Sequence, residues 1–206
     1  MQFVIIGGNG FVGECLTKNL ILKNKKVIVI ARTKKNLSNN NLLTYIKGDI
    51  FNFEKINFKN DDNDTILIHL IGTIKNKKNY TKVNSESVMY SLNFCKKHNI
   101  KKIIFLSANY GEKNYLESKL LAEKFILDSG LDFLIIKSGL IFHRKRFSSF
   151  LLAYFLKFCY YVPFLKKLVA KVYPLPLDVV CEKIITTLLK NPEKKYLTLE
   201  ELRRTE

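Results

Sequence analysis

The opening residues 1–13 constrain the fold of this chain more than any other stretch. Residues 2–6 form the short apolar run of a buried strand, and Gly7, Gly10 and Gly13 follow in a G-x-x-G-x-x-G array. Residues 11–22 then carry apolar side chains at helical spacing. A strand, a glycine-rich turn and a helix in immediate succession are typical of a dinucleotide-binding site. The sequence therefore predicts that a pyrophosphate group binds at this turn.

Each glycine of the array has an expected physical role. Gly7 allows a tight turn, Gly10 lets backbone approach the pyrophosphate because it lacks a Cβ, and Gly13 allows the helix to pack closely on the strand. The helix N-terminus offers N–H groups without intrahelical acceptors and a partial positive charge. These features favour an anionic ligand.

The rest of the chain alternates apolar strands with amphipathic helices. Because strands joined through helices pair in parallel, we expect a Rossmann-type, doubly wound α/β fold in a single domain, residues 1–206, with a small C-terminal helical cap. We expect Gly130 to stop one helix and Asp178 to N-cap another. The predicted strands are 26–31, 43–46, 65–71, 102–107, 133–137 and 196–199, and the predicted helices are 82–98, 114–129 and 179–190.

Composition narrows the classes of partner. The net charge of +17 accompanies an abundance of Lys and Asn along the whole chain, as a coding bias towards A and T would produce, and no nucleic-acid-binding motif stands out. Nucleic acid is therefore not an expected partner. The four widely spaced cysteines indicate reduced thiols and no metal site. With no secretory signal in view, we expect a cytoplasmic protein that is at most peripheral to a membrane.

The region 144–177 differs from the rest in being apolar, aromatic and basic. No Asp or Glu lies between Asp132 and Asp178, and the apolar run is too short and too interrupted for a confident membrane span. Pro163 is expected to end or kink a helix there. Two interpretations stay open. The region caps a substrate cleft, or it presents an interfacial helix to anionic lipid or to a membrane complex.

Several motifs taken together resemble a known superfamily. They appear in family order and cover nearly the whole chain: GGNGFVG (7–13), KGDI (47–50), ILIHLIGTI (66–74), VNSES (83–87), FLSA (105–108), YLESKLLAE (115–123) and PLPLDVV (174–180). In these the chain resembles an atypical short-chain dehydrogenase/reductase. It is most similar to the NADPH-binding accessory subunit of respiratory complex I and its bacterial relatives, within the NmrA-like and epimerase-like NAD(P)-binding proteins.

The resemblance implies a set of catalytic residues. Tyr115 and Lys119 are four apart and so share one helix face, as in the Y-x-x-x-K pair whose ammonium lowers the pKa of the phenol and orients the nicotinamide ribose. Tyr115 would then exchange a proton with a substrate oxygen during hydride transfer. The resemblance gives Ser107 the role of holding that oxygen and Asn84 that of organising a proton-relay water.

The expected cofactor is NADP(H) rather than NAD(H). A carboxylate at the end of the second strand would bind the ribose hydroxyls of NAD, but Arg32 stands there with Lys35 close behind, and a guanidinium suits a 2′-phosphate. Asp49 would contact the adenine, although a turn after Gly48 explains it nearly as well. The nucleotide-binding residues implied are Gly7, Gly10, Phe11, Val12, Gly13, Arg32, Lys35, Asp49, Ile50, Leu70, Ile71, Gly72, Tyr115 and Lys119.

Two departures from the family leave the activity open. Only residues 108–114 separate Ser107 from Tyr115, and residues 137–143 replace an Arg-Pro-Ser segment that ends in Gly. One hypothesis is an oxidoreductase acting on a small carbonyl, hydroxyl or quinone-like substrate. The other is a non-catalytic NADPH-binding accessory or sensor subunit that docks on a membrane complex. Of the histidines, His69 is expected in the core, and His98 at a helix C-terminus where a cation suits the dipole.

Overall fold

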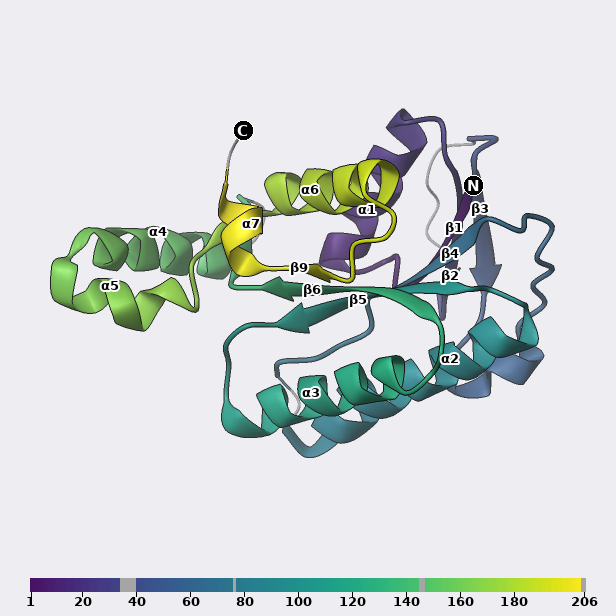
Figure 1. Ribbon diagram of the computed structural model, residues 1–206, viewed down its shortest axis with the longest axis horizontal. Coiled ribbons are helices and arrows are strands. Elements are labelled where there is room, and N and C mark those ends of the chain that lie inside the picture. Colours follow the sequence, from purple (N-terminus) through teal and green to yellow (C-terminus); the bar gives the residue numbers. More distant parts are fainter. Residues whose placement is uncertain (34–39, 76, 145–146, 205–206) are drawn as a thin grey trace.

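A seven-stranded parallel sheet forms the centre of the molecule (Figure 1). The computed structural model describes residues 1–33, 40–75, 77–144 and 147–204. The strand order is β3-β2-β1-β4-β5-β6-β9, and every neighbouring pair is parallel. The strands are β1 Gln2–Ile6, β2 Lys26–Ala31, β3 Leu43–Lys47, β4 Thr65–His69, β5 Lys102–Ala108, β6 Asp132–Ser138 and β9 Tyr196–Leu197. This is the doubly wound Rossmann-type fold that the sequence predicts.

Helices cover both faces of the sheet, and β1 shows why. Its side chains alternate, so that Phe3 and Ile5 pack against the helices of one face while Val4 and Ile6 pack against those of the other. Figure 1 shows α1, α6 and α7 on one face of the sheet and α2 and α3 on the other. Because both faces are buried, the strand is continuously apolar. The helices are α1 Phe11–Leu22, α2 Ser87–Lys97, α3 Lys113–Leu127, α6 Leu177–Lys190 and α7 Leu199–Arg203.

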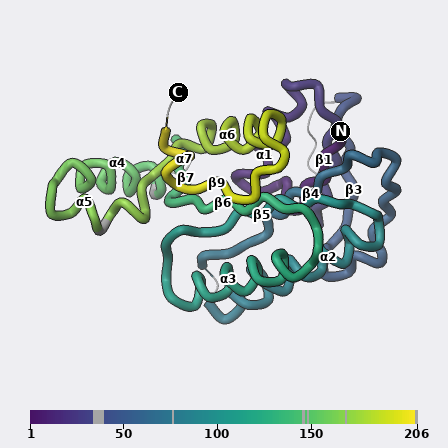
Figure 2. The backbone as a smooth tube through the Cα atoms, in the orientation of Figure 1, coloured from purple at the N-terminus to yellow at the C-terminus, as the bar shows by residue number. Residues whose placement is uncertain are grey.

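Two further helices form a hairpin that extends from one end of the sheet (Figures 1 and 2). They are α4 Phe147–Tyr161 and α5 Pro163–Ala170, and the short parallel pair β7 Ile141–Phe142 and β8 Leu175–Pro176 lies at their base. Pro163 occupies the first turn of α5, where a missing N–H costs nothing, so it separates the two helices as expected. No helix in the described part of the chain is long and apolar enough to cross a membrane.

The structure corrects several element boundaries. The helix predicted over 82–98 begins as a π-helical turn, η3 Thr81–Glu86, before α2. Asp178 is not an N-cap, because α6 starts at Leu177 with Pro176 in the cap position. The last strand stops at Leu197, where Thr198 and Glu201 form a capping box that starts the unpredicted helix α7. Gly130 follows α3 with φ +74°, the left-handed conformation that ends a helix.

Candidate functional site

A cleft of about 780 Å³ lies beyond the carboxyl ends of β1, β4, β5 and β6. The turn after β1 forms one wall, and the first half of α3 forms another. The chain segments after β6 and the start of α4 complete it, with Gly139 and Ser149 among the lining residues. In open parallel sheets this is the edge where ligands bind.

The glycine turn has the geometry of an anion cradle. Gly7 has φ +85°, and its carbonyl accepts a hydrogen bond of 2.9 Å from the N–H of Gly10. Gly10 caps α1, so the N–H groups of residues 11–13 start the helix without intrahelical acceptors, and these residues line the cleft together with Gly7 and Gly10. The geometry fits a dinucleotide pyrophosphate.

Gly13 is enclosed by the turn itself. A Cβ there would lie 2.6 Å from Gly8 Cα and 2.7 Å from the carbonyl oxygens of Gly7 and Gly8. The close approach expected between helix and strand is therefore between the helix and the turn. No structural role was predicted for Gly8 from the sequence. A Cβ at that position would lie 2.7 Å from a Val29 methyl carbon, so the turn packs closely on β2 here as well.

The residues proposed to contact the adenosine half lie at the ends of β2 and β3. Arg32 is exposed directly after β2, and the side-chain amide of Asn9 ties the glycine turn to the same corner by donating to Thr33 O at 2.6 Å. Lys35 lies outside the described residues. Asp49 caps the short helix η1 Ile50–Lys55 by accepting from Phe51 N at 3.1 Å. The side chain of Ile50 belongs to the hydrophobic core, so only its backbone is available to a ligand.

The segment after β4 brings the cleft floor against α3. Leu70 donates its N–H to Ile6 O at 2.9 Å, and Leu70 and Gly72 line the cleft. A Cβ on Gly72 would lie 3.3 Å from both Asn84 Oδ1 and Lys119 Nζ, a tight contact that glycine avoids. Ile71 instead packs against the core beneath α2 and α3.

Asn84 holds this segment in place. Its Oδ1 accepts from Thr73 N at 2.7 Å, and its Nδ2 donates to Thr73 O at 3.1 Å and to Ser118 Oγ at 3.0 Å. The side chain is fully buried. These hydrogen bonds hold the Thr73 backbone in place, and the expected role of Asn84 in ordering a relay water stays a prediction.

Tyr115 and Lys119 both line the cleft from one face of α3. Lys119 Nζ donates to Leu106 O at 3.0 Å, and burial lowers its pKa to about 8 against an opposing effect of Glu123. The Tyr115 ring meets the edge of Tyr80 at 5.7 Å, and burial raises its pKa to about 12, with Tyr80 adding to the rise. The expected lowering of the tyrosine pKa by Lys119 is therefore wrong for this structure.

Ser107 has a partner that the sequence did not indicate. Its hydroxyl donates to Glu123, whose other carboxylate oxygen is 2.7 Å from Lys137 Nζ. The Glu123 side chain is only 9% exposed. Tyr115, Lys119 and Glu123 succeed one another at four-residue steps on α3, and that spacing is the sequence signal that would have revealed the carboxylate. The structure thus brings Tyr115 and Lys119 together at the cleft, whereas the Ser107 hydroxyl is hydrogen-bonded to Glu123.

The short loop after β5 carries lining residues to which the sequence analysis assigned no role. Tyr110 and Glu112 line the cleft from this loop, and Tyr110 is 54% exposed. Tyr80 also lines the cleft and donates its hydroxyl to Ile74 O at 3.0 Å. These groups supply hydroxyl and carboxylate contacts near Tyr115.

Two of the three histidines, His69 and His98, lie outside the set of residues that line the cleft. His69 is fully buried between Ser91 Oγ at 2.8 Å and Ser87 Oγ at 3.2 Å, and burial lowers its pKa to about 3, which confirms it as a core residue. His98 does end α2, but burial and Lys97 lower its pKa, so the expected cation is disfavoured. Within the described part of the chain, no group of three or more His, Cys, Asp or Glu is placed to hold a metal ion.

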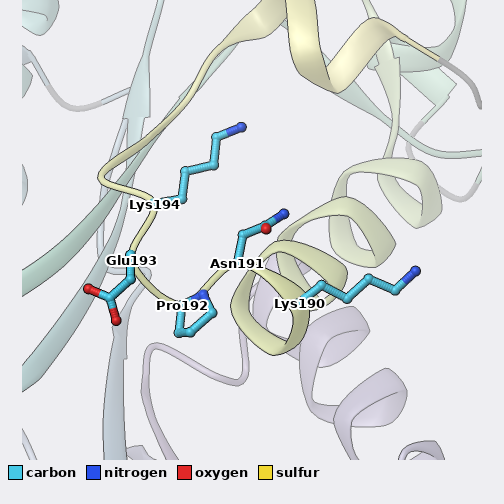
Figure 3. Close-up of a pocket in the computed structure, with 5 residues that line it drawn as sticks. All are labelled: Lys190, Asn191, Pro192, Glu193 and Lys194. Atoms are coloured by element: carbon cyan, nitrogen blue, oxygen red, sulfur yellow. The ribbon is translucent and has the colours of Figure 1, made fainter.

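A second hollow, of about 620 Å³, lies at the turn after α6 (Figure 3). It is formed by residues 190–194 alone, and Glu193 points away from the two lysines. Two of its polar groups are engaged with other parts of the chain, since Lys194 pairs with Glu201 and the Pro192 carbonyl accepts from Lys102. The hollow shows no converging groups that would bind a ligand.

Comparison with known proteins agrees with this geometry. The model of the NAD(P)H-binding family matches residues 7–148. An uncharacterised chloroplastic protein of Arabidopsis thaliana is 24% identical over 161 residues, which are 70% of this chain and 52% of that protein. The chain therefore spans about half the length of this curated relative.

Solved structures of low sequence identity share the fold. The Bordetella bronchiseptica enzyme WbmG, in complex with NAD, matches with a TM-score of 0.68 and 14% identity over 97% of this chain and 72% of its own. UDP-glucuronic acid 4-epimerase from Bacillus cereus and UDP-glucose 4-epimerase from Thermus thermophilus, both in complex with NAD, match with TM-scores of 0.68 over 97% of this chain. Their identities are 16% and 14%, and 77% of each is covered.

Proposed function

Because the chain belongs to the NAD(P)H-binding family, with the fold of the short-chain dehydrogenase/reductases, we propose that it is an NAD(P)H-dependent oxidoreductase. Its substrate would be a small carbonyl, hydroxyl or quinone-like compound. The observation that carries the proposal is that Tyr115 and Lys119 line the same cleft as the glycine turn. In this proposal residues 1–206 form one nucleotide-binding domain, and residues 144–177 border its substrate side.

The chain has groups for each part of the reaction. The N–H groups at the start of α1 would hold the pyrophosphate, and Gly72 would leave room for the ribose beside Lys119. The bound nicotinamide would supply or accept the hydride. Tyr115 would give the proton to the substrate oxygen. With a pKa raised to about 12 its hydroxyl is protonated at neutral pH, which favours the direction of carbonyl reduction.

Lys119 would orient the nicotinamide ribose through its ammonium group. Its pKa of about 8 means that the ammonium form is lost as the pH rises through that value. Turnover is therefore expected to fall on the alkaline side with an apparent pKa near 8.

We propose NADP(H) as the preferred nucleotide because of Arg32. Its guanidinium is exposed at the end of β2, beside the corner that Asn9 ties to the glycine turn. The similar solved structures named above hold NAD, so the preference needs direct measurement. Calorimetric titration with NADPH and NADH is the test, and Arg32→Asp is expected to reverse the order of affinities. Equal affinities for both nucleotides in the wild-type protein would refute the role of Arg32.

The deciding experiment for the reaction is the Tyr115→Phe variant. Oxidation of NADPH would be followed against a panel of small quinones, aldehydes and ketones. Loss of the proton donor is expected to lower turnover by roughly 10²–10⁴-fold while nucleotide affinity is kept. Tyr110→Phe, which removes another tyrosine hydroxyl that lines the cleft, is the matched control. Equal turnover by Tyr115→Phe and wild type would refute the assignment.

A second candidate function is a non-catalytic NADPH-binding accessory or sensor subunit that docks on a membrane complex. The contact that favours it is the bond from Ser107 to Glu123, which leaves the serine hydroxyl committed to the protein. This function predicts tight nucleotide binding with no oxidation of NADPH by any substrate in the panel.

A further inference from the structure

The α4–α5 hairpin carries the largest concentration of exposed apolar side chains on the described surface. Among the described residues, 17 large apolar side chains are exposed, and eight of them lie on these two helices. They are Phe147, Leu151, Leu152, Tyr154, Phe155, Phe158, Tyr161 and Phe164. A monomer that exposes so many aromatic and aliphatic groups together marks an interaction site rather than random surface.

Helix α4 carries an apolar stripe of the kind that usually faces a protein core, but here the stripe is exposed. Phe147, Leu151, Phe155 and Phe158 follow one another at three- and four-residue steps, which places them on one stripe, and each is at least 62% exposed. Ala153 and Cys159 are buried on the inner side. The apolar stripe therefore faces away from the protein that α4 packs against.

Contacts with the body of the protein fix this orientation. Arg203 of α7 donates from Nη2 to the hydroxyl oxygen of Tyr160 at 2.6 Å. The same guanidinium lies 4.7 Å from the centre of the Tyr160 ring and 4.1 Å from that of Tyr173. Because α4 is held by its C-terminal end between these groups, the outward direction of the stripe is part of the fold.

The charge of the hairpin has a single sign. Lys166, Lys167 and Lys171 are exposed, and Lys157 is half-buried with Nζ 5.1 Å from the centre of the Phe142 ring. The sequence contains no Asp or Glu from residue 133 to 177. Two copies of this face would bring lysines against lysines with no acidic partner, so the face is poorly suited to pairing with itself.

From these observations we infer that the α4–α5 hairpin binds the surface of an anionic phospholipid bilayer. Phe155, Phe158 and their neighbours enter the interfacial layer, and the lysines meet the anionic headgroups. The hairpin protrudes from the sheet, as a convex element must in order to reach a planar surface (Figure 1). The inference is independent of the proposed reaction, because it requires neither nucleotide nor turnover.

A tryptophan reporter tests insertion directly, because the chain contains no Trp. In a Phe155→Trp variant of the full chain, vesicles of phosphatidylcholine and phosphatidylglycerol are expected to shift the emission to shorter wavelength. Spin labels on the lipid headgroups are expected to quench it. Leu22→Trp on α1, where the exposed fraction is 71% against 62% for Phe155, is the control and is expected to show neither effect. No shift in Phe155→Trp, or equal shifts at both sites, would overturn the inference.

Vesicle co-sedimentation separates the apolar and charge contributions. Phe155→Ser/Phe158→Ser and Lys166→Glu/Lys167→Glu are each expected to weaken binding by about tenfold or more, and high salt is expected to weaken wild-type binding. Leu22→Ser replaces an exposed apolar side chain elsewhere, and Lys18→Glu/Lys23→Glu reverses two exposed lysines elsewhere; both variants are expected to bind as wild type. Sedimentation equilibrium tests the alternative that a second copy of the chain covers this face. A dimer that Phe155→Ser/Phe158→Ser dissociates would assign the face to a second copy and refute the lipid inference.

Discussion

Replacing Gly13 by alanine tests whether close packing of α1 on the glycine turn holds the nucleotide site in shape. The added Cβ would lie 2.6–2.7 Å from three backbone atoms of Gly7 and Gly8, whereas non-bonded carbon atoms normally stay about 3.5–4.0 Å apart. Since backbone atoms cannot rotate aside, the turn or the helix must move by roughly 1 Å to restore that spacing. Gly13→Ala therefore disturbs the turn that presents Gly7 and Gly10 to the cleft.

The cost follows from two opposing effects. Overpacking of this kind destabilises by about 3 kcal/mol, at the upper end of the usual range because every clash is with backbone. The higher helix propensity of alanine offsets about 1 kcal/mol of this loss in stability. The net loss of about 2 kcal/mol is expected to lower Tm by roughly 4–8 °C for a chain of this size. A circular-dichroism melt measures it, and the rise in Tm on adding NADPH is expected to shrink as well.

Gly10→Ala is the matched control for this prediction. A Cβ at Gly10 would have a single neighbour within 4 Å, the carbonyl oxygen of Gly7 at 3.1 Å, and its φ of −77° suits any residue. The stability loss is expected to stay under about 1 kcal/mol, while the methyl group occupies the approach of the pyrophosphate and removes the NADPH effect on Tm. If Gly13→Ala melts with the wild type, or if Gly10→Ala loses as much stability, the packing explanation is refuted.

Three further predictions concern ionisable groups. The pKa of Lys119 is lowered from 10.5 to about 8, so between these pH values the unfolded chain binds more protons than the folded protein and the free energy of unfolding rises with pH. Urea unfolding at a series of pH values should show this rise, up to about 3 kcal/mol, in the wild type and not in Lys119→Met. Identical pH profiles for the two proteins would contradict the prediction. Glu123→Gln removes the negative charge beside Lys137 and leaves one acceptor oxygen where Ser107 and Lys137 each had their own. Because Lys137 is 27% exposed, we expect the free energy of unfolding to fall by about 2 kcal/mol, and a double-mutant cycle with Lys137→Met should give a coupling above about 1 kcal/mol rather than additive losses. The Cys15 thiol is half-exposed and a hydrogen bond from Cys181 lowers its pKa, whereas burial raises the pKa of Cys95. Mass spectrometry after iodoacetamide treatment of the folded protein should therefore find Cys15 modified before Cys95. Modification of both thiols at a similar rate would count against this prediction.

Sequence patterns alone were enough to predict the sheet and the nucleotide cradle, because their signals are local. The continuous apolar run of β1 marks a strand buried on both faces, and Gly7 and Gly130 mark positive φ values within single turns. The four-residue step from Tyr115 to Lys119 places both side chains on one helix face, and the structure brings that face to the cleft. Their catalytic use, and the contacts assigned to Arg32 and Asp49, stay predictions.

Only the tertiary structure decided which groups meet across long separations in the chain. It paired Ser107 with Glu123, committed Asn84 to the backbone of Thr73, and turned the apolar stripe of α4 outward by holding Tyr160 against Arg203. Apolar periodicity shows that a helix has an apolar face, but not whether the protein core or the outside receives it. Partners distant in sequence depend on how the packed layers are placed relative to each other, and that placement is a property of the folded molecule as a whole.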